Sequence, residues 1–230
     1  MLAVSLGLPE WAEPIVRYMA TEGLKGTARI AVIALVGSLV IGMVLGTLLT
    51  LRFTLVRAAI RGYIEVWRGL PILVTVFMVF FALPALGIRL DVFVSAGIAL
   101  MLWGSAQVAE ATRGAVQSIP REQHEAAAAL GFGWVGRHVN VILPQAYRRL
   151  IPPLVGLLVN ILQNTTIAAV IGATELLESG KQSIERVAAV PPAGYGEIHS
   201  FEIYGAVAVV FFVISFPLTR LAAYLERRLV

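Results

Sequence analysis

The sequence predicts an all-α integral membrane protein with five transmembrane helices, and three observations support this prediction. Of the 230 residues, 58% are hydrophobic and only 14% are charged, whereas a soluble domain carries about 25% charged residues. Uncharged segments recur along the chain, and about 20 apolar residues suffice to cross roughly 30 Å of hydrocarbon. The segments between them are short, so we expect residues 1–230 to form a single transmembrane domain.

Windows without any charged side chain define the five expected spans. They cover residues 30–51, 69–88, 92–109, 150–174 and 203–219. The further apolar stretch Ala126–Tyr147 carries Arg137 and His138 at its centre, where an arginine costs at least about 2.5–3.5 kcal/mol. We therefore assign residues 113–149 to a loop. The segment Pro9–Gly26 has mixed polarity and fits an interfacial helix or a frayed terminus equally well.

Basic residues indicate the orientation, because cytoplasmic loops of membrane proteins are enriched in Lys and Arg. Five spans place 12 of the 18 basic residues on one side: Arg52, Arg57, Arg61, Arg68, Arg113, Arg121, Arg137, Arg148, Arg149, Arg220, Arg227 and Arg228. We expect this side to be cytoplasmic, with the N-terminus outside, the C-terminus inside and residues 113–149 as the longest cytoplasmic loop. The net charge of +4 then reflects topology, and we expect no nucleic-acid partner.

Several kinds of chemistry are disfavoured by composition. The chain has no cysteine, and its three histidines are scattered, so we expect no disulfide and no metal site. No window contains His, Asp, Glu or Lys, so an intramembrane hydrolase would lack its base. We therefore expect no catalytic residue. A secondary transporter or channel driven by an ion gradient is the alternative function, and it would be expected to carry ionisable residues inside its spans.

The loop contains a predicted helix that starts at Pro120. Pro opens helices well, the alanines after Glu125 propagate the helix, and Gly131 can end it. Such a helix of about 11 residues is too short to span the membrane. Helix chemistry alone favours a solvated connector here. Before the loop, Glu110 and Arg113 are spaced i, i+3 at the end of the third window, which fits a local ion pair or a gate contact.

The loop sequence carries a more specific pattern. Glu125-Ala126-Ala127, Gly131 and Val141-Ile142-Leu143-Pro144 resemble the EAA loop of membrane permease subunits of binding-protein-dependent ABC importers. Trp67-Arg68-Gly69-Leu70-Pro71, Ala109-Glu110-Ala111-Thr112-Arg113-Gly114 and Asn164-Thr165-Thr166 resemble the polar amino acid branch of that family. The similarity extends from about Thr27 to the C-terminus.

This resemblance implies a fold and a set of partners. The fold is the membrane domain of a type I ABC importer in a bacterial cytoplasmic membrane. The loop residues Glu125, Ala126, Ala127, Gly131, Leu143 and Pro144 would couple the spans to two separate ATPase subunits, which bind ATP and Mg. The only Gly-Lys pair, Gly180-Lys181, lacks the P-loop pattern, so we expect no cofactor in this chain. A second membrane subunit, an external binding protein and a polar amino acid substrate complete the expectation.

The fourth window contains a group of amides. Asn160, Gln163 and Asn164 are spaced i, i+3 and i+4 and therefore share one helix face, and Thr165 follows them. An unpaired amide in hydrocarbon costs several kcal/mol, so this face should meet protein or water. From the residues alone, interhelical hydrogen bonding and a substrate path are equally good interpretations. The resemblance favours a path over Asn160, Gln163, Asn164 and Thr165.

The same residues bear on the substrate. Many relatives carry Lys-Asp where this chain has Gln163-Asn164, and a cationic amino acid would require a carboxylate within about 4–6 Å. Amides both donate and accept hydrogen bonds and suit a neutral polar group. We therefore predict a neutral or acidic amino acid rather than arginine or lysine.

Overall fold

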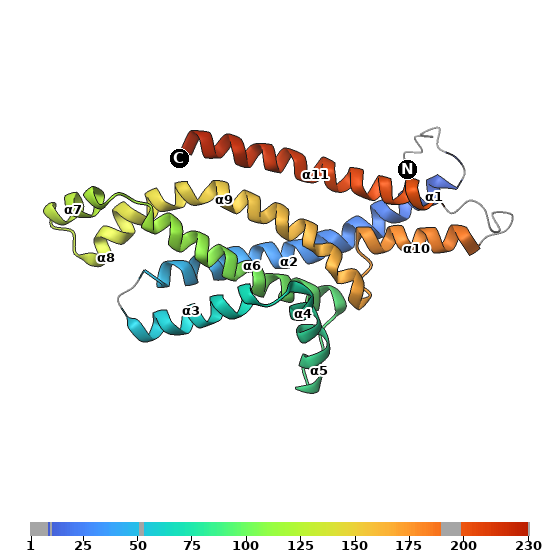
Figure 1. Cartoon of the computed structure of the whole chain (residues 1–230), viewed down its shortest axis with the longest axis horizontal. Helices are drawn as coiled ribbons and strands as arrows, with labels where there is room; N and C mark the ends of the chain where they lie inside the picture. The colour runs from blue at the N-terminus through green and yellow to red at the C-terminus, as the bar shows by residue number, and fades with distance from the viewer. Residues whose placement is uncertain (1–8, 10, 51–52, 190–198, 230) are drawn as a thin grey trace.

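The computed structural model describes residues 9, 11–50, 53–189 and 199–229, and in these residues all regular structure is helical. Figure 1 shows the long helices lying side by side along the longest axis, with short helices at both ends of the bundle. The short helix α7 (Arg121–Ala129) lies at one end, and α10 (Leu176–Ala189) lies at the other. The bundle therefore has two distinct ends joined by long apolar helices.

Four long helical segments have the length and hydropathy of membrane spans. The first joins α1 (Ala12–Tyr18), η1 (Met19–Gly23) and α2 (Leu24–Leu48), and the second is α6 (Val92–Gln117). The third joins α8 (Trp134–Arg137), η3 (His138–Ile142), α9 (Leu143–Asn164) and η4 (Thr165–Ile171). The fourth is α11 (Ser200–Leu229). All four contain most of an expected window, although Leu51 lies outside the described residues.

The fifth expected span has a different shape from a straight helix over residues 69–88. Helix α3 (Thr54–Gly69) is followed, after a bend of 105°, by α4 (Ile72–Phe77), η2 (Met78–Ala82) and α5 (Leu83–Ala85). Leu70 is extended, with φ −79° and ψ 137°, because a residue before proline avoids helical geometry. The two pieces count as one span only if the bent pair crosses the membrane together.

Two segments that the sequence left outside the spans are helical extensions. Residues 12–26 continue directly into α2, so this part of the chain is neither a separate interfacial helix nor a frayed end. Residues 134–149 likewise continue into the third long helix. Of the loop predicted over residues 113–149, only α7 and the turns on either side of it lie outside the long helices.

Helices α2 and α6 pack with almost no space between them. A Cβ at Gly42 would lie 2.4 Å from Val108 Cβ, and one at Gly46 would lie 2.5 Å from both the Ala109 carbonyl oxygen and Thr112 Cβ. No real Cβ contact is that short. The GxxxG pair in the first span therefore sets the distance between the two helices, as small residues do at membrane helix interfaces.

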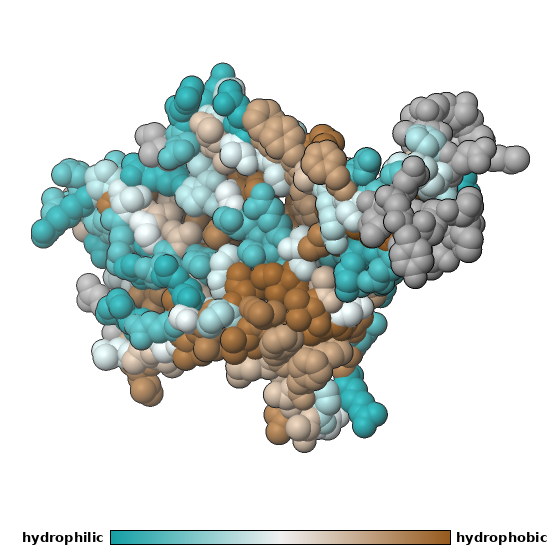
Figure 2. Space-filling view, turned by 45° about the vertical axis from the view of Figure 1, so that its right-hand side comes forward, coloured by the Kyte–Doolittle hydropathy of each residue, from teal (hydrophilic) through white to brown (hydrophobic). Residues whose placement is uncertain are grey.

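The outer helices leave most of their apolar surface uncovered. In the most hydrophobic part of α11 only 11% of the residues are buried within the chain, compared with 56% for α6. In Figure 2, hydrophobic surface gathers in the lower middle of the molecule and hydrophilic groups gather toward the left. The uncovered apolar faces suit contact with lipid or with another membrane subunit.

Candidate functional site

Helix α7 forms as the sequence predicts, and a Schellman motif ends it. The Gly131 amide donates to the Ala128 carbonyl at 3.0 Å, and the Phe132 amide donates to the Ala127 carbonyl at 3.1 Å. This motif requires a left-handed residue, and Gly131 has φ +82°. Gly131 thus fixes where the helix stops and where the chain turns back.

The Glu-Ala-Ala residues of α7 point in different directions. Ala127 is 2% exposed, whereas Ala126 and Glu125 are exposed. Glu125 pairs with Arg121 at 3.0 Å on the helix surface. Beyond the helix, Leu130 is 78% exposed and Val135 is 66% exposed. The exposed side of α7 and the turn after it thus offers small and apolar side chains with an accessible carboxylate.

Three long polar side chains attach this segment to the helices beside it. Arg137 donates to the His124 carbonyl at 3.3 Å, and Gln145 donates to Gln123 Oε1 at 3.1 Å. Arg149 donates to the Ser118 carbonyl at 2.7 Å. The sequence indicated Arg137 and Arg149 only as cytoplasmic charges. Their place in the same loop as the Glu-Ala-Ala residues was the one signal for these contacts.

Apolar packing supports the other end of the motif. Ile142 and Ala146 are buried together with Val116 and Ile119, and Leu143 packs against this cluster. Pro144 is exposed. This cluster joins the end of α6 to the start of α9, and α7 is attached to the same long helix by the hydrogen bonds of Arg137 and Gln145.

A pair of histidines lies inside this segment. The rings of His124 and His138 are 6.0 Å apart, and His138 Nδ1 lies 2.9 Å from the Trp134 carbonyl. Burial, and then the charges of His138 and Arg137, lower the pKa of His124. Its ring is therefore neutral at pH 7 and adds no positive charge to the segment.

The amides of the fourth span lie on the outside of the described chain. Asn160 and Gln163 are exposed, Asn164 is half-buried and Thr165 is fully buried. Asn160 donates to the Gly156 carbonyl at 3.2 Å, and Asn164 donates to the Asn160 carbonyl at 2.9 Å. These bonds each use one amide N–H, so further hydrogen-bonding capacity remains on this face.

The helix changes character directly after the amides. Thr165 Oγ1 donates to the Leu162 carbonyl at 2.7 Å, and from Thr165 to Ile171 the helix is 3-10. It ends at Gly172, with φ +83°. The expected span to residue 174 is therefore an α-helix only as far as Asn164, and the amide face lies where the two helix types meet.

Glu110 and Arg113 form a two-contact ion pair at the end of α6. Arg113 Nε donates to Glu110 Oε2 at 3.1 Å, its Nη2 contacts Oε1, and its Nη1 donates to Gln117 at 2.6 Å. Helix α3 lies next to this pair, and residues of α3 line a small cavity together with Glu110 and Arg113. The geometry is that of a local ion pair, and the gate contact stays a prediction.

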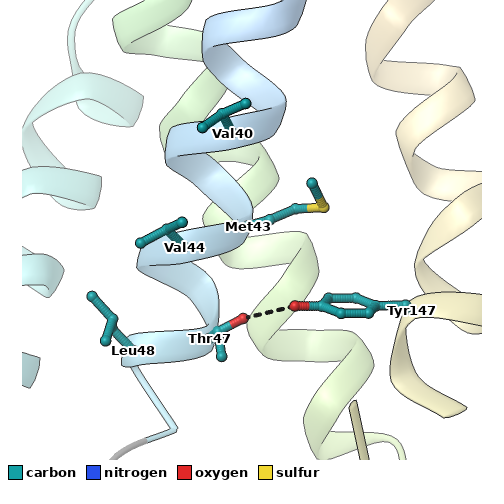
Figure 3. Close-up of a pocket in the computed structure, with 6 residues that line it drawn as sticks. All are labelled: Val40, Met43, Val44, Thr47, Leu48 and Tyr147. Carbon is teal, nitrogen blue, oxygen red and sulfur yellow. Dashed lines mark hydrogen bonds between the residues drawn. The ribbon is translucent and has the colours of Figure 1, made fainter. Parts of the chain in front are cut away.

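An apolar groove lies between α2 and α9 (Figure 3). It measures about 400 Å³ and is lined by Val40, Met43, Val44, Thr47, Leu48 and Tyr147. Its one polar contact joins Thr47 Oγ1 and the Tyr147 hydroxyl at 3.3 Å. The groove offers almost no hydrogen-bonding group, so it is a poor site for a polar amino acid.

Glu175 is a structural residue that the sequence argument passed over. It is fully buried and caps α10, accepting hydrogen bonds from the backbone amides of Leu177 at 2.9 Å and Glu178 at 2.8 Å. Burial raises the pKa of this carboxyl, and the two amide donors oppose the shift. Glutamate is not among the residues preferred at an N-cap, so the sequence carried no strong signal for this role.

Comparisons with known proteins show the family of the chain. The family model for the binding-protein-dependent transport system inner membrane component matches residues 38–230. The glutamine transport system permease protein GlnP of Escherichia coli (strain K12) is 37% identical over 210 residues, covering 90% of this chain and 91% of the relative. The probable glutamine ABC transporter permease protein GlnM of Bacillus subtilis (strain 168) is 33% identical, covering 92% and 93%.

Solved structures share the fold. A crystal structure of an amino acid ABC transporter with histidines has a TM-score of 0.80 and 26% identity, covering 96% of this chain and 99% of its own. An inward-facing structure of the MetNI methionine ABC transporter has a TM-score of 0.73 and 18% identity, covering 95% and 99%. This second likeness concerns the fold alone.

The chain is therefore an inner membrane permease component with the membrane-domain fold of ABC importers. It belongs to the family of binding-protein-dependent transport system inner membrane components. This membership confirms the resemblance inferred from the loop motif and does not support the ion-gradient-driven alternative. Among the described residues, no group of three or more His, Asp or Glu side chains could hold a metal ion.

Proposed function

We propose that this chain is the permease subunit of an importer for a neutral polar amino acid, with glutamine as the first candidate. The observation that carries the proposal is the amide face of α9, which is exposed to the outside of the chain. It is polar but uncharged, and it lies within a span of otherwise apolar character. Two relatives are named for glutamine transport, whose side chain carries the same amide group.

The exposed amide face implies a second membrane subunit. An exposed amide in hydrocarbon would leave hydrogen-bonding groups unpaired at a cost of several kcal/mol. A second subunit, identical or paralogous, would cover this face and enclose a polar path between the two chains. Asn160, Gln163, Asn164 and Thr165 would line that path, with Asn164 near the middle of the predicted span.

The energy would come from two ATPase subunits that bind ATP and Mg. We assign their docking to the exposed side of α7, with Glu125, Ala126 and the turn at Gly131 as contacts. Ala127 and Leu143 would position α7 against the neighbouring helices, and the exposed Pro144 would be a further contact. An external binding protein would deliver the substrate at the opposite end of the bundle, near α10.

The proposed orientation places α7 in the cytoplasm and α10 outside, following the distribution of arginines. Single cysteines test it, because the natural chain has none. A cysteine at Lys181, on the exposed face of α10, should react with an impermeant thiol reagent added to intact cells. A cysteine at Gly133 should react only after permeabilisation. The reverse pattern would contradict the orientation.

The substrate proposal is tested by transport in proteoliposomes that contain this chain as the only type of membrane subunit. The vesicles would hold the two ATPase subunits and receive the cognate binding protein and ATP. We expect ATP-dependent uptake of labelled L-glutamine and at least about tenfold slower uptake of L-arginine, because the path lacks a carboxylate partner for the guanidinium. Equal or faster arginine uptake would contradict the proposal.

A further inference from the structure

A small charged cavity lies between α3 and the end of α6, at the same end of the bundle as α7. Its volume is about 140 Å³. In liquid water, roughly four or five molecules fill this volume. Arg61, Glu65, Arg68, Glu110 and Arg113 line it together with two apolar side chains. Five charged groups around one small space call for a physical explanation.

Two of these groups already have partners. Glu110 and Arg113 hold each other through two contacts, and Arg113 also donates to Gln117. Their charges are opposite, and both carboxylate oxygens of Glu110 already accept a contact from Arg113. The pair forms one wall of the cavity, and the charges of Arg61 and Arg68 also act on Glu110.

The three charged groups on α3 are different. Arg61, Glu65 and Arg68 are spaced i, i+4 and i+7, so they share one face of α3. Arginine and glutamate at such spacings commonly pair along a helix surface. Here none of the three side chains makes an ion pair within 4.0 Å or a hydrogen bond with any other described residue. Arg61 and Arg68 act on Glu110 only through their charge, without a hydrogen bond. The cavity thus presents two guanidinium groups and one carboxylate whose hydrogen-bonding groups are available to a ligand.

This set of groups complements the head group of a free amino acid. A guanidinium binds a carboxylate through two parallel hydrogen bonds, and Arg61 and Arg68 stand on either side of Glu65 along the helix. The Glu65 carboxylate can accept hydrogen bonds from an ammonium group, which is a pure donor. An amino acid zwitterion carries both of these charged groups on the same carbon atom. A simple inorganic anion would use the arginines and leave Glu65 as a repelling neighbour.

We propose that this cavity is a second binding site for the α-amino acid head group, on the release side of the permease. It would be occupied after the substrate leaves the amide face and before it reaches the cytoplasm. The proposal rests on the proposed function, because it takes the transported amino acid as the ligand. Its residues lie on α3 and α6, separate from the amides of α9.

Equilibrium binding of radiolabelled L-glutamine to the purified permease–ATPase complex, without the binding protein, tests the site. The double variant Arg61→Gln, Arg68→Gln should weaken binding at least about tenfold, the effect of about 1.4 kcal/mol. Arg57→Gln is the matched control, because Arg57 lies one turn away on the same helix face and does not line the cavity. Retained assembly and basal ATP hydrolysis would show that each variant is folded.

Two glutamine analogues test the charge requirement. 4-Carbamoylbutanoate lacks the ammonium group and 4-aminobutanamide lacks the carboxylate, and both should bind at least about tenfold more weakly than glutamine, because each loses one charged partner. Equal binding of 4-carbamoylbutanoate would contradict a zwitterion site, since it would show that an anion suffices.

Uptake and binding measurements together distinguish a failure of the release-side site from a failure of the proposed permease function. Wild-type glutamine uptake together with unchanged binding in the double variant would overturn the release-side site and leave the permease function standing. Binding that is lost in Asn164→Ala but kept in the double variant would also overturn it, because the only site would then lie on α9. Absence of glutamine uptake by the wild-type complex would instead refute the proposed substrate, and with it the ligand of this cavity.

Discussion

The α2–α6 interface and the amide face of α9 are both parts of membrane spans, but they are built on opposite principles. Between α2 and α6, glycines remove side chains until backbone and side-chain atoms of the two helices touch. On α9, Asn160 and Gln163 remain exposed, and the chain supplies few partners for them. The packing contacts of the first region are made within one chain. The amides of the second region need a partner subunit, water or a substrate to fill their remaining hydrogen bonds.

This difference separates the scaffold from the working surface. A membrane helix pair gains no hydrophobic driving force from association, so close packing of small residues has to hold it. An exposed polar face gains nothing from packing and is retained for another purpose. We expect substitutions in the first region to affect the amount of folded protein and substitutions in the second to affect transport.

The largest expected effect is that of Gly46→Ala. Its Cβ would lie 2.5 Å from the Ala109 carbonyl oxygen, so α2 and α6 must separate, and overpacking of this kind costs about 1–3 kcal/mol. We expect a clear loss of detergent-stable protein and a lower midpoint of thermal unfolding.

The matched control for this substitution is Gly205→Ala on α11. A Cβ at Gly205 has no neighbour within 4 Å, and alanine is a better helix former than glycine by about 1 kcal/mol. The variant should be as stable as the natural protein or slightly more stable. Equal stability of both variants would show that the glycines do not set the α2–α6 distance.

A smaller effect is expected on the amide face. Asn164→Ala removes one half-buried amide, and a single hydrogen bond contributes about 0.5–1.5 kcal/mol. We expect uptake to fall by about two- to tenfold, with basal ATP hydrolysis and yield unchanged. The control is Thr166→Ala, because Thr166 donates only to its own helix at Gln163. Unchanged uptake in Asn164→Ala would return the amides to a purely structural role.

How much the sequence could predict follows the same division. The helices and the break at Gly131 were predictable because they depend on local features, namely uncharged windows, the alanine run and the need for a positive φ. The clustering of Asn160, Gln163 and Asn164 on one face followed from helical spacing alone. These features require no knowledge of where other helices lie.

Features that depend on distant segments could not be predicted in the same way. The bend at Leu70 is not such a feature, because Pro71 signals it locally, although the window at residues 69–88 has the composition of an uninterrupted span. Thr27 accepts a hydrogen bond from the Leu176 amide across 149 residues of sequence. The charged cavity likewise forms only because α3 folds back beside α6, which brings Arg61 and Glu110 to one place.

The central claim is that α7 transmits the action of separate ATPase subunits to the spans, and Gly131 tests it most directly. Binding-protein-stimulated ATP hydrolysis would be measured in reconstituted complexes that carry Gly131→Asp or Gly133→Asp. The two variants add the same carboxylate two residues apart, but only residue 131 has a positive φ, whereas residue 133 has φ −61°. A Cβ in the left-handed conformation costs about 1–2 kcal/mol, and this cost would distort the end of α7.

We expect Gly131→Asp to insert into the membrane at a normal level and to lose both ATPase assembly and stimulation by the binding protein. Gly133→Asp should keep at least about half of the stimulation, because aspartate at the N-cap of α8 is favourable. Full stimulation and normal transport by Gly131→Asp would contradict the claim that this helix end couples ATP hydrolysis to the movement of substrate.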